Sequence, residues 1–281
     1  NVPSPSWGGT GWGASSIFCW QHTCMTATLD TPREITLSGA PEGLDALVVA
    51  GIAAEGGASH PVLHVVRDDR RLETAEAALK FFAPDLQIVT FPAWDCVPYD
   101  RVSPGADLVA RRVAALARLG LMKRDKPMVV LATVNAVLQR VPGRKFLRET
   151  AKVLAPDQRL DMGELRRSLE IAGYVNTSTV MERGEYAARG HIVDLFPPGR
   201  TSPVRLDFFG DTIETIKPFD PETQRTSKSV NRANLLPVSE ASFGEASISR
   251  FRTRYIELFG AVTRDDPLYE AVSAGQRFPG L

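Results

Sequence analysis

A run of alternating side chains in the second half of the chain constrains its fold more than any other feature. The segment VRLDFF, residues 204–209, alternates valine, leucine and phenylalanine with arginine and aspartate. This period of two is typical of a strand with one buried face. Gly210-Asp211 follows and leads into the run TIETI. Because glycine supplies the positive φ that a tight turn needs, the sequence predicts an antiparallel hairpin.

Phe209 breaks the alternation and leaves two interpretations open. It falls on the polar face beside Arg205. An aromatic residue next to an arginine on an outward face is the composition of a protein–protein hot spot. Alternatively, Phe209 ends the strand and folds back under the turn into the core. The sequence alone favours neither.

Length, charge and cysteine content exclude several classes of protein. The 281 residues leave room for two domains. The 33 basic and 33 acidic residues balance, which argues against a surface that mainly neutralises DNA phosphate. No stretch approaches the ~20 apolar residues of a membrane span. The three cysteines form no disulfide framework, so we expect a reducing, cytoplasmic compartment.

Residues 1–24 differ from the rest of the chain. They mix Gly, Ser and Trp without any helical or strand period and lack the features of a signal peptide. We interpret them as a non-native or disordered leader, with the protein starting at Met25. Cys19, His22 and Cys24 lack a fourth ligand at suitable spacing, so no metal is expected. At the other end the chain stops in mid-pattern, as the front piece of a longer polypeptide would.

Residues 25–150 read as the first part of an α/β domain. Three short apolar runs alternate with helical patterns, which indicates a parallel sheet. The expected strands are 62–66, 87–91 and 128–131, and the expected helices are 42–56, 70–82, 106–119 and 134–140. In the third helix the spacing turns Val109 and Val113 inward and leaves Arg111, Arg112 and Arg118 in solvent.

The pattern changes after Pro142. Arg144, Lys145 and Arg148 read as part of a solvated linker. Residues 151–237, with one helix and several antiparallel strands, read as an inserted α+β domain of the size of a small domain. Residues 238–281 return to helix, and we expect them to be a truncated return to the first domain.

Four blocks of the chain resemble a known family. The blocks are RGEYAARGHIVDLFPPG, PVRLDFFGDTIETIKPFDPETQRT, FPAWDCVPYDRVSPGADLVARRVAALARL and RFRTRYIELFGAVTRDDPLYEAVSAGQRFPG. They resemble the amino-terminal module of bacterial transcription-repair coupling factors, which is related to the front of the excinuclease protein UvrB. The similarity extends from about residue 25 to the end of the chain.

The resemblance implies a fold and a function. The fold would be a degenerate nucleotide-hydrolase-like parallel-sheet domain with an inserted α+β domain. That inserted domain would recruit the excinuclease protein UvrA to stalled RNA polymerase for transcription-coupled nucleotide excision repair. It would also contact the parent's carboxyl-terminal region as an autoinhibitory clamp. The parent would be an ATP-dependent DNA translocase whose downstream regions bind ATP and Mg, RNA polymerase and DNA.

The resemblance also implies which residues bind the partner. Carried over to this sequence, the docking residues are Arg189, Arg205 and Phe209. The alternation already places Arg205 and Phe209 on one face, if Phe209 does not fold back. Arginine suits this role because its planar guanidinium pairs carboxylates bidentately.

The sequence lacks the catalytic features of a nucleotide-dependent helicase, which is the alternative function. A phosphate loop reads G-x-x-x-x-G-K-[ST]. Gly51 and Gly56 have a matching spacing, but no Lys or hydroxyl follows, and no Gly-Lys pair occurs anywhere. The aromatic hairpin expected of UvrB is reduced to a short loop with Trp94, Pro98 and Tyr99, which we expect to pack on the first domain. We therefore expect no catalytic residues and no cofactor in this segment.

Overall fold

Residues 36, 41–96, 102–121, 123–241, 243–262, 266–276 and 278 are described by this computed structural model. The predicted leader at 1–24 lies outside the described residues, as do Pro98 and Tyr99. The described residues from Pro41 onward belong to one compact unit.

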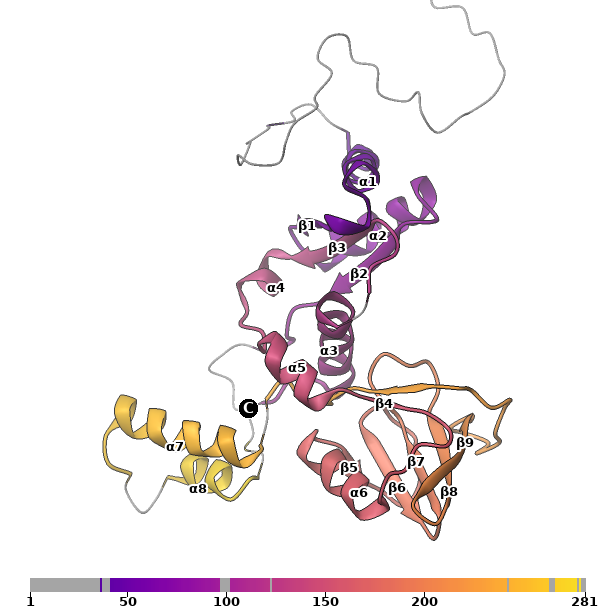
Figure 1. Ribbon diagram of the computed structural model, residues 1–281. Helices are drawn as coiled ribbons and strands as arrows, with labels where there is room; N and C mark the ends of the chain where they lie inside the picture. Colours follow the sequence, from indigo (N-terminus) through magenta and orange to yellow (C-terminus); the bar gives the residue numbers. More distant parts are fainter. Residues whose placement is uncertain are drawn as a thin grey trace, which may run out of the picture. The chain divides into compact units, whose positions relative to one another are not determined.

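The first sheet has three parallel strands in the order β1-β3-β2 (Figure 1). Its strands are β1 (Val62–Val66), β2 (Gln87–Phe91) and β3 (Met128–Thr133). The helices around it are α1 (Leu44–Gly56), α2 (Asp69–Phe82), α3 (Ala106–Gly120) and α4 (Val134–Leu138), with a short 3₁₀ turn, η1 (Gly57–Ser59), after α1. All six residues of β3 are buried, as expected for a parallel strand covered on both faces.

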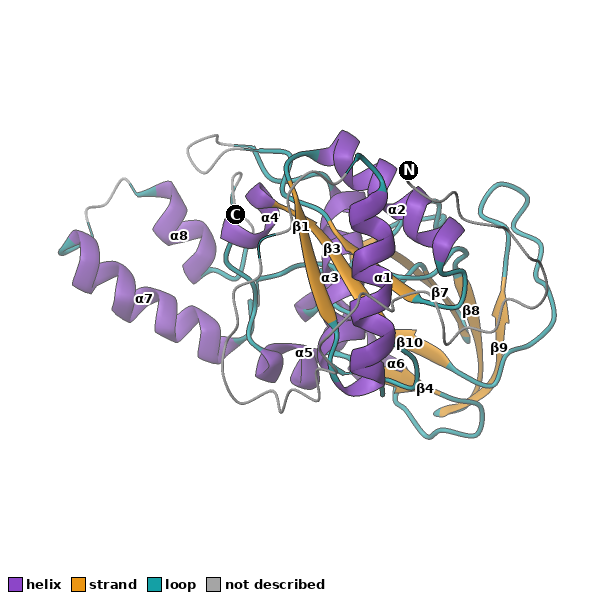
Figure 2. Ribbon diagram, turned by 90° about the horizontal axis from the view of Figure 1, so that it is seen from above, coloured by secondary structure: helices purple, strands orange, loops and turns teal. Residues whose placement is uncertain are grey.

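Two separate cores flank this sheet. On one face α1 and α2 pack with Val66, Val129 and Leu131; α1 runs beside β1 and β3 in Figure 2. On the other face α3 and α4 pack with Phe91 and Val130. The predicted alternation of strands and helices is therefore confirmed as an α/β layer with helices on both sides.

The second large sheet has five strands in the order β5-β6-β7-β8-β9. These are β5 (Val175–Asn176), β6 (Glu185–Arg189), β7 (Ile192–Leu195), β8 (Val204–Phe209) and β9 (Thr212–Pro218). Strands β6 to β9 are antiparallel neighbours, and β5 runs parallel to β6. Gly210 has φ +61° between β8 and β9, so the predicted hairpin is confirmed.

One helix and a two-stranded ribbon complete the core of this sheet. The helix is α6 (Met162–Ile171), and the ribbon consists of β4 (Lys152–Leu154) paired with β10 (Ala233–Leu235). Leu165 and Leu169 of α6, together with Leu154 and Leu235, are buried against the inner face. The predicted domain boundaries at residues 25, 151 and 238 stay predictions.

The predicted linker after Pro142 is instead a helix, α5 (Arg144–Thr150). Leu147 is buried and Phe146 packs beside it, in a cluster that also contains Val113 and Ala117 of α3. The basic residues suggested solvent exposure, but two adjacent apolar residues are enough to fix one short helix on a neighbour.

Two helices follow the second sheet, α7 (Glu245–Phe259) and α8 (Pro267–Ser273). They lie side by side (Figure 2). Phe251 and Tyr255 of α7 contact Tyr269 of α8, with ring centroids 6.0 and 5.3 Å apart. Aromatic side chains four positions apart on α7 therefore join the two helices.

Arg112 contradicts the prediction that it lies in solvent, because it is fully buried. Its Nε and Nη2 donate to the two carboxylate oxygens of Glu240, at 2.5 and 3.3 Å. Its Nη1 donates to the Pro92 carbonyl at 2.7 Å and to Gln139 Oε1 at 2.9 Å. A partner 128 positions away cannot be read from helical spacing, which is why the local pattern failed here.

Aromatic rings enclose the same guanidinium. Its central carbon lies 4.4 Å from the Phe91 ring centroid and 5.0 Å from that of Trp94, within the range of cation–π attraction. The Trp94 indole also donates to Glu240 Oε1 at 3.1 Å. The prediction that Trp94 packs against the first domain is therefore confirmed.

Removing the Glu240 carboxylate tests this buried pair. Glu240→Ala should lower the free energy of unfolding by about 3–5 kcal/mol, because it leaves a buried cation without its counter-ion. Equilibrium urea unfolding measures the change.

Glu257→Ala serves as the matched control. Glu257 also pairs with an arginine, Arg254, but both side chains are exposed on α7, so the loss should be about 0.5 kcal/mol. Equal small losses in the two variants would show that the Arg112 pair contributes no more than a surface pair.

Candidate functional site

The outer face of the five-stranded sheet gathers the polar side chains of this sheet. Strand register places Asp194 of β7 directly opposite Arg205 of β8, and Ile192 opposite Asp207. Arg189, at the end of β6, pairs in turn with Ile192. We call Arg189, Asp194, Arg205, Asp207 and Phe209 the outer-face group. The intervening residues, such as Leu206 and Phe208, point into the core.

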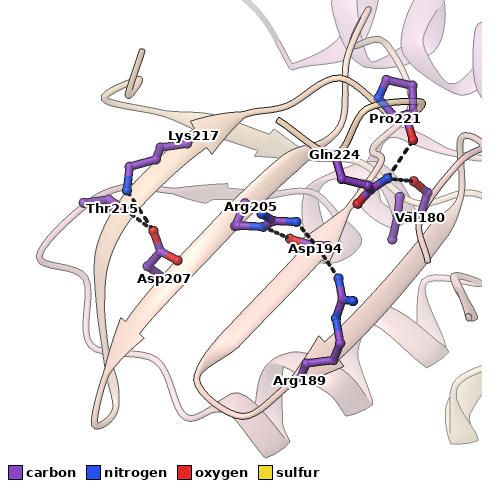
Figure 3. Close-up of polar contacts among 9 residues, drawn as sticks. All are labelled: Val180, Arg189, Asp194, Arg205, Asp207, Thr215, Lys217, Pro221 and Gln224. Atoms are coloured by element: carbon purple, nitrogen blue, oxygen red, sulfur yellow. Dashed lines mark hydrogen bonds and ion pairs between the residues drawn. The ribbon is translucent and has the colours of Figure 1, made fainter. Parts of the chain in front are cut away.

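Asp194 is the centre of this group and is fully buried. Arg205 donates to it bidentately, from Nε to Oδ1 at 2.7 Å and from Nη2 to Oδ2 at 2.9 Å (Figure 3). Arg189 donates from Nη2 to the same Oδ2, also at 2.9 Å. Two guanidinium groups therefore share one carboxylate, so the cluster has a net positive charge. Charge-assisted bidentate bonds of this kind are strong and fix geometry.

The guanidinium of Arg205 already uses its bidentate donors and one of its flat faces. The hydrogen bond to Asp194 raises the pKa of the Arg205 guanidinium, and the Phe219 ring centroid lies 5.0 Å from its central carbon. Only 20 % of its side chain is exposed, against 56 % for Arg189. Arg189 is therefore the more accessible of the two cations, and Arg205 also holds the sheet surface together.

A second polar cluster lies beside the first, on β8 and β9 (Figure 3). Asp207 accepts hydrogen bonds from Thr215 Oγ1 at 2.6 Å and from Lys217 Nζ at 3.1 Å. Burial alone would raise the pKa of Asp207, but these two hydrogen bonds hold it below its usual value. The ionised carboxylate therefore stabilises the folded sheet.

Phe209 is 81 % exposed at the end of β8. The interpretation in which it folds back under the turn is therefore wrong, and the outward interpretation is confirmed. A large exposed ring beside arginines offers an apolar anchor on a surface that is otherwise polar. The structure thus places all three sequence-predicted residues on one face.

Sequence reasoning missed Asp194, which organises this face. A local signal was present: the segment IVDL sets one aspartate between Val193 and Leu195 on a short apolar strand. A buried carboxylate needs cationic partners, and the nearest candidates by strand pairing were the predicted arginines.

Gly51 and Gly56, whose spacing matches that of a phosphate loop, belong to a helix, as the helix expected over residues 42–56 predicted. Both glycines lie within α1, whereas a phosphate loop precedes its helix. Helix α1 begins after Gly43, which has φ +98°. The first turn of this helix carries Leu44 and Asp45, neither of which supplies a cation for phosphate.

Asp45 has a structural partner instead. It accepts a hydrogen bond from Arg71 Nη2 at 2.7 Å. Burial alone would raise the pKa of Asp45, but the Arg71 bond and charge keep it below its usual value. Asp45 thus ties α1 to α2.

The described residues offer no candidate for a membrane span or a metal site. None of the described helices combines the length and apolar character needed to cross a membrane. Within the same part of the chain, no three or more His, Cys, Asp and Glu side chains gather as a metal site would require.

The domain profile and the similar proteins point to one family. The profile described as UvrB interaction domain matches residues 153–240, which contain the outer-face group. The chain is 33% identical over 240 residues to the transcription-repair-coupling factor of Haemophilus influenzae, covering 85% of this chain and 20% of that protein. It is 38% identical over 197 residues to that of Escherichia coli, covering 70% of this chain and 17% of that protein. It is 36% identical over 193 residues to that of Myxococcus xanthus, covering 66% of this chain and 16% of that protein. The resemblance is confirmed, and the chain spans about a fifth of these relatives.

The pKa of Asp207 gives a test of the face as a structural unit. Its folded value is lowered, so its contribution is complete above the ordinary carboxyl pKa of about 3.9 and is lost as the pH falls below it. Asp207→Asn should therefore lower the free energy of unfolding by about 1–2 kcal/mol at pH 7, and by less at pH 3.

Urea unfolding at the two pH values measures this difference. Asp85→Asn, at an exposed position in the turn after α2, is the control and should change little at either pH. A gap between Asp207→Asn and the unmodified chain that stays constant from pH 7 to pH 3 would contradict the role assigned to the ionised carboxylate.

Proposed function

We propose that this chain recruits the excinuclease protein UvrA to RNA polymerase stalled at DNA damage. The chain belongs to the transcription-repair coupling factor family and is homologous to about a fifth of such a protein. The observation that carries the proposal is the outer-face group, which lies within the residues matched by the UvrB interaction domain. This is a protein-docking role in transcription-coupled nucleotide excision repair.

The outer-face group has the chemistry of a protein contact. Phe209 supplies an exposed aromatic anchor, and the half-exposed Arg189 keeps donors that Asp194 does not use. Aromatic and arginine side chains dominate the energetics of protein interfaces. The cluster of Arg189, Asp194 and Arg205 has a net positive charge, which fits a partner surface with a carboxylate next to an apolar hollow.

The first sheet acts in this proposal as a scaffold without catalysis. Its parallel strands with helices on both faces fit a nucleotide-hydrolase-like layer, but the sequence has no Gly-Lys pair such as a phosphate loop requires. The missing motif also argues against the alternative, a helicase of the UvrB type. In the parent, the ATP- and Mg-dependent motor and the contacts to RNA polymerase and DNA lie in other regions.

The same face also suits an intramolecular clamp. A contact between the outer-face group and the parent's carboxyl-terminal region would hide Phe209 until the motor engages. Since one surface cannot hold both partners, release of the clamp would allow UvrA to bind.

Truncation of Phe209 tests docking with little effect on the fold. Phe209→Ala should weaken binding to purified UvrA by at least about thirtyfold, the effect of losing about 2 kcal/mol at a hot spot. The melting temperature should barely change, because the ring is 81 % exposed. Biolayer interferometry with immobilised chain measures the affinity.

Phe81→Ala is the matched control. Phe81 is 80 % exposed but lies on α2, outside the outer-face group. Its truncation should leave the affinity unchanged. Loss of binding in Phe81→Ala but not in Phe209→Ala would move the docking site away from the five-stranded sheet.

Catalytic inactivity is tested separately. The chain with Mg and ATP should release no phosphate above the protein-free rate, because the sequence lacks the Gly-Lys pair of a phosphate loop. A malachite-green assay at several protein concentrations measures this. Mg-dependent release proportional to protein concentration would show that the scaffold retains a catalytic site.

A further inference from the structure

A cavity of about 680 Å³ lies where α3 and β2 meet the segment after β7. Ile88, Val89 and Thr90 of β2 form one wall, and Gly199 and Arg200 contribute another. That segment lies close to α3, since a Cβ on Gly199 would be 3.1 Å from the Ala114 Cβ. Gly199 also has φ +79°. The cavity is thus formed at the junction between the two sheets, where the backbone at Gly199 comes close to α3.

Four arginines and two carboxylates line the cavity, so its lining has a net positive charge. Both carboxylates are already engaged. Asp107 accepts from Arg183 Nη1 at 2.6 Å and lies 3.3 Å from Arg111 Nε. Glu76 pairs with Lys80 at 2.6 Å and accepts from Thr90 Oγ1 at 3.2 Å.

The other two arginines, Arg118 and Arg200, have no carboxylate partner among the described residues. The Nε of Arg200 is buried and makes no hydrogen bond there. Burial lowers the pKa of the Arg200 guanidinium, since no anion offsets the lost hydration. A buried donor without an acceptor is costly, and a bound anion would remove that cost.

We propose that this cavity binds a small phosphorylated molecule whose phosphate pairs with Arg118 and Arg200. Guanidinium groups bind phosphate bidentately. The volume lies in the range of about 300–1,000 Å³ that is usual for small-molecule sites. Ile88, Val89 and Leu236 offer apolar surface for the organic part of such a ligand.

This site is separate from α1, none of whose residues lines it. Neither carboxylate in its lining is free to hold Mg, so binding requires no divalent cation. A nucleic acid fits less well, because the chain as a whole carries no net charge and nucleic-acid surfaces are broadly basic.

Ligand binding would stabilise the junction. The cavity is lined by α3 of the first layer and by the segment that leads into β8. A ligand that binds only the folded chain raises its stability by mass action. The ligand would therefore hold the five-stranded sheet and the first layer together.

Titration with inorganic pyrophosphate in Mg-free buffer tests the proposal on the whole chain, without UvrA. We expect saturable heat release by calorimetry and a rising melting temperature. Inorganic phosphate and adenosine 5′-monophosphate, in parallel titrations, show whether the phosphate group alone or the attached organic part supplies the affinity.

Arg118→Gln and Arg200→Gln should each weaken pyrophosphate binding at least tenfold. Arg67→Gln, at an exposed position that does not line the cavity, should leave it unchanged. Circular dichroism checks that each variant is folded. The proposal is overturned by an absence of saturable binding, by equal binding in all variants, or by an equal shift with sodium chloride of matched ionic strength. None of these results bears on docking through Phe209.

Discussion

The buried ion pair between Arg112 and Glu240 is the interaction on which the arrangement of the chain depends. It joins α3 of the first layer to the residues that follow the five-stranded sheet. All three guanidinium nitrogens donate to protein acceptors, and the Phe91 and Trp94 rings lie against the group. A pair with such complete hydrogen bonding offsets its desolvation, whereas removal of either partner leaves an isolated buried charge. The residues that follow the five-stranded sheet are thus fixed to the first layer.

The same principle operates at the surface, with a different consequence. Asp194 is buried and depends on Arg205 and Arg189 for compensation. Arg205 therefore cannot be removed without cost to the fold, while Phe209 makes no comparable contribution. Loss of binding in an Arg205 variant would mix stability with recognition. Variants of Phe209 and, in part, of Arg189 can test recognition without a comparable loss of stability.

Local periodicity was enough to predict the strands, the main helices and the face of Arg205, because these follow from residues a few positions apart, but it left the side of Phe209 open. It failed where a distant or isolated residue decides the outcome. Arg112 is buried because it pairs with Glu240, 128 positions away. Helix α5 is held in place because its own Leu147 packs against α3. Asp194 was missed because a single polar residue in a four-residue strand makes no pattern of its own. Arg118 and Arg200 share a cavity only through the fold.

The start of α1 is held by an ion pair rather than by a bound nucleotide. A phosphate loop needs a cation at one position and a hydroxyl at the next to hold Mg-nucleotide. No Gly-Lys pair occurs in this chain, and the first turn of α1 carries Asp45, which accepts a hydrogen bond from Arg71 at 2.7 Å. That ion pair connects α1 to α2 without any ligand. The first layer can then serve as a constant support, and recognition passes to the surface of the five-stranded sheet.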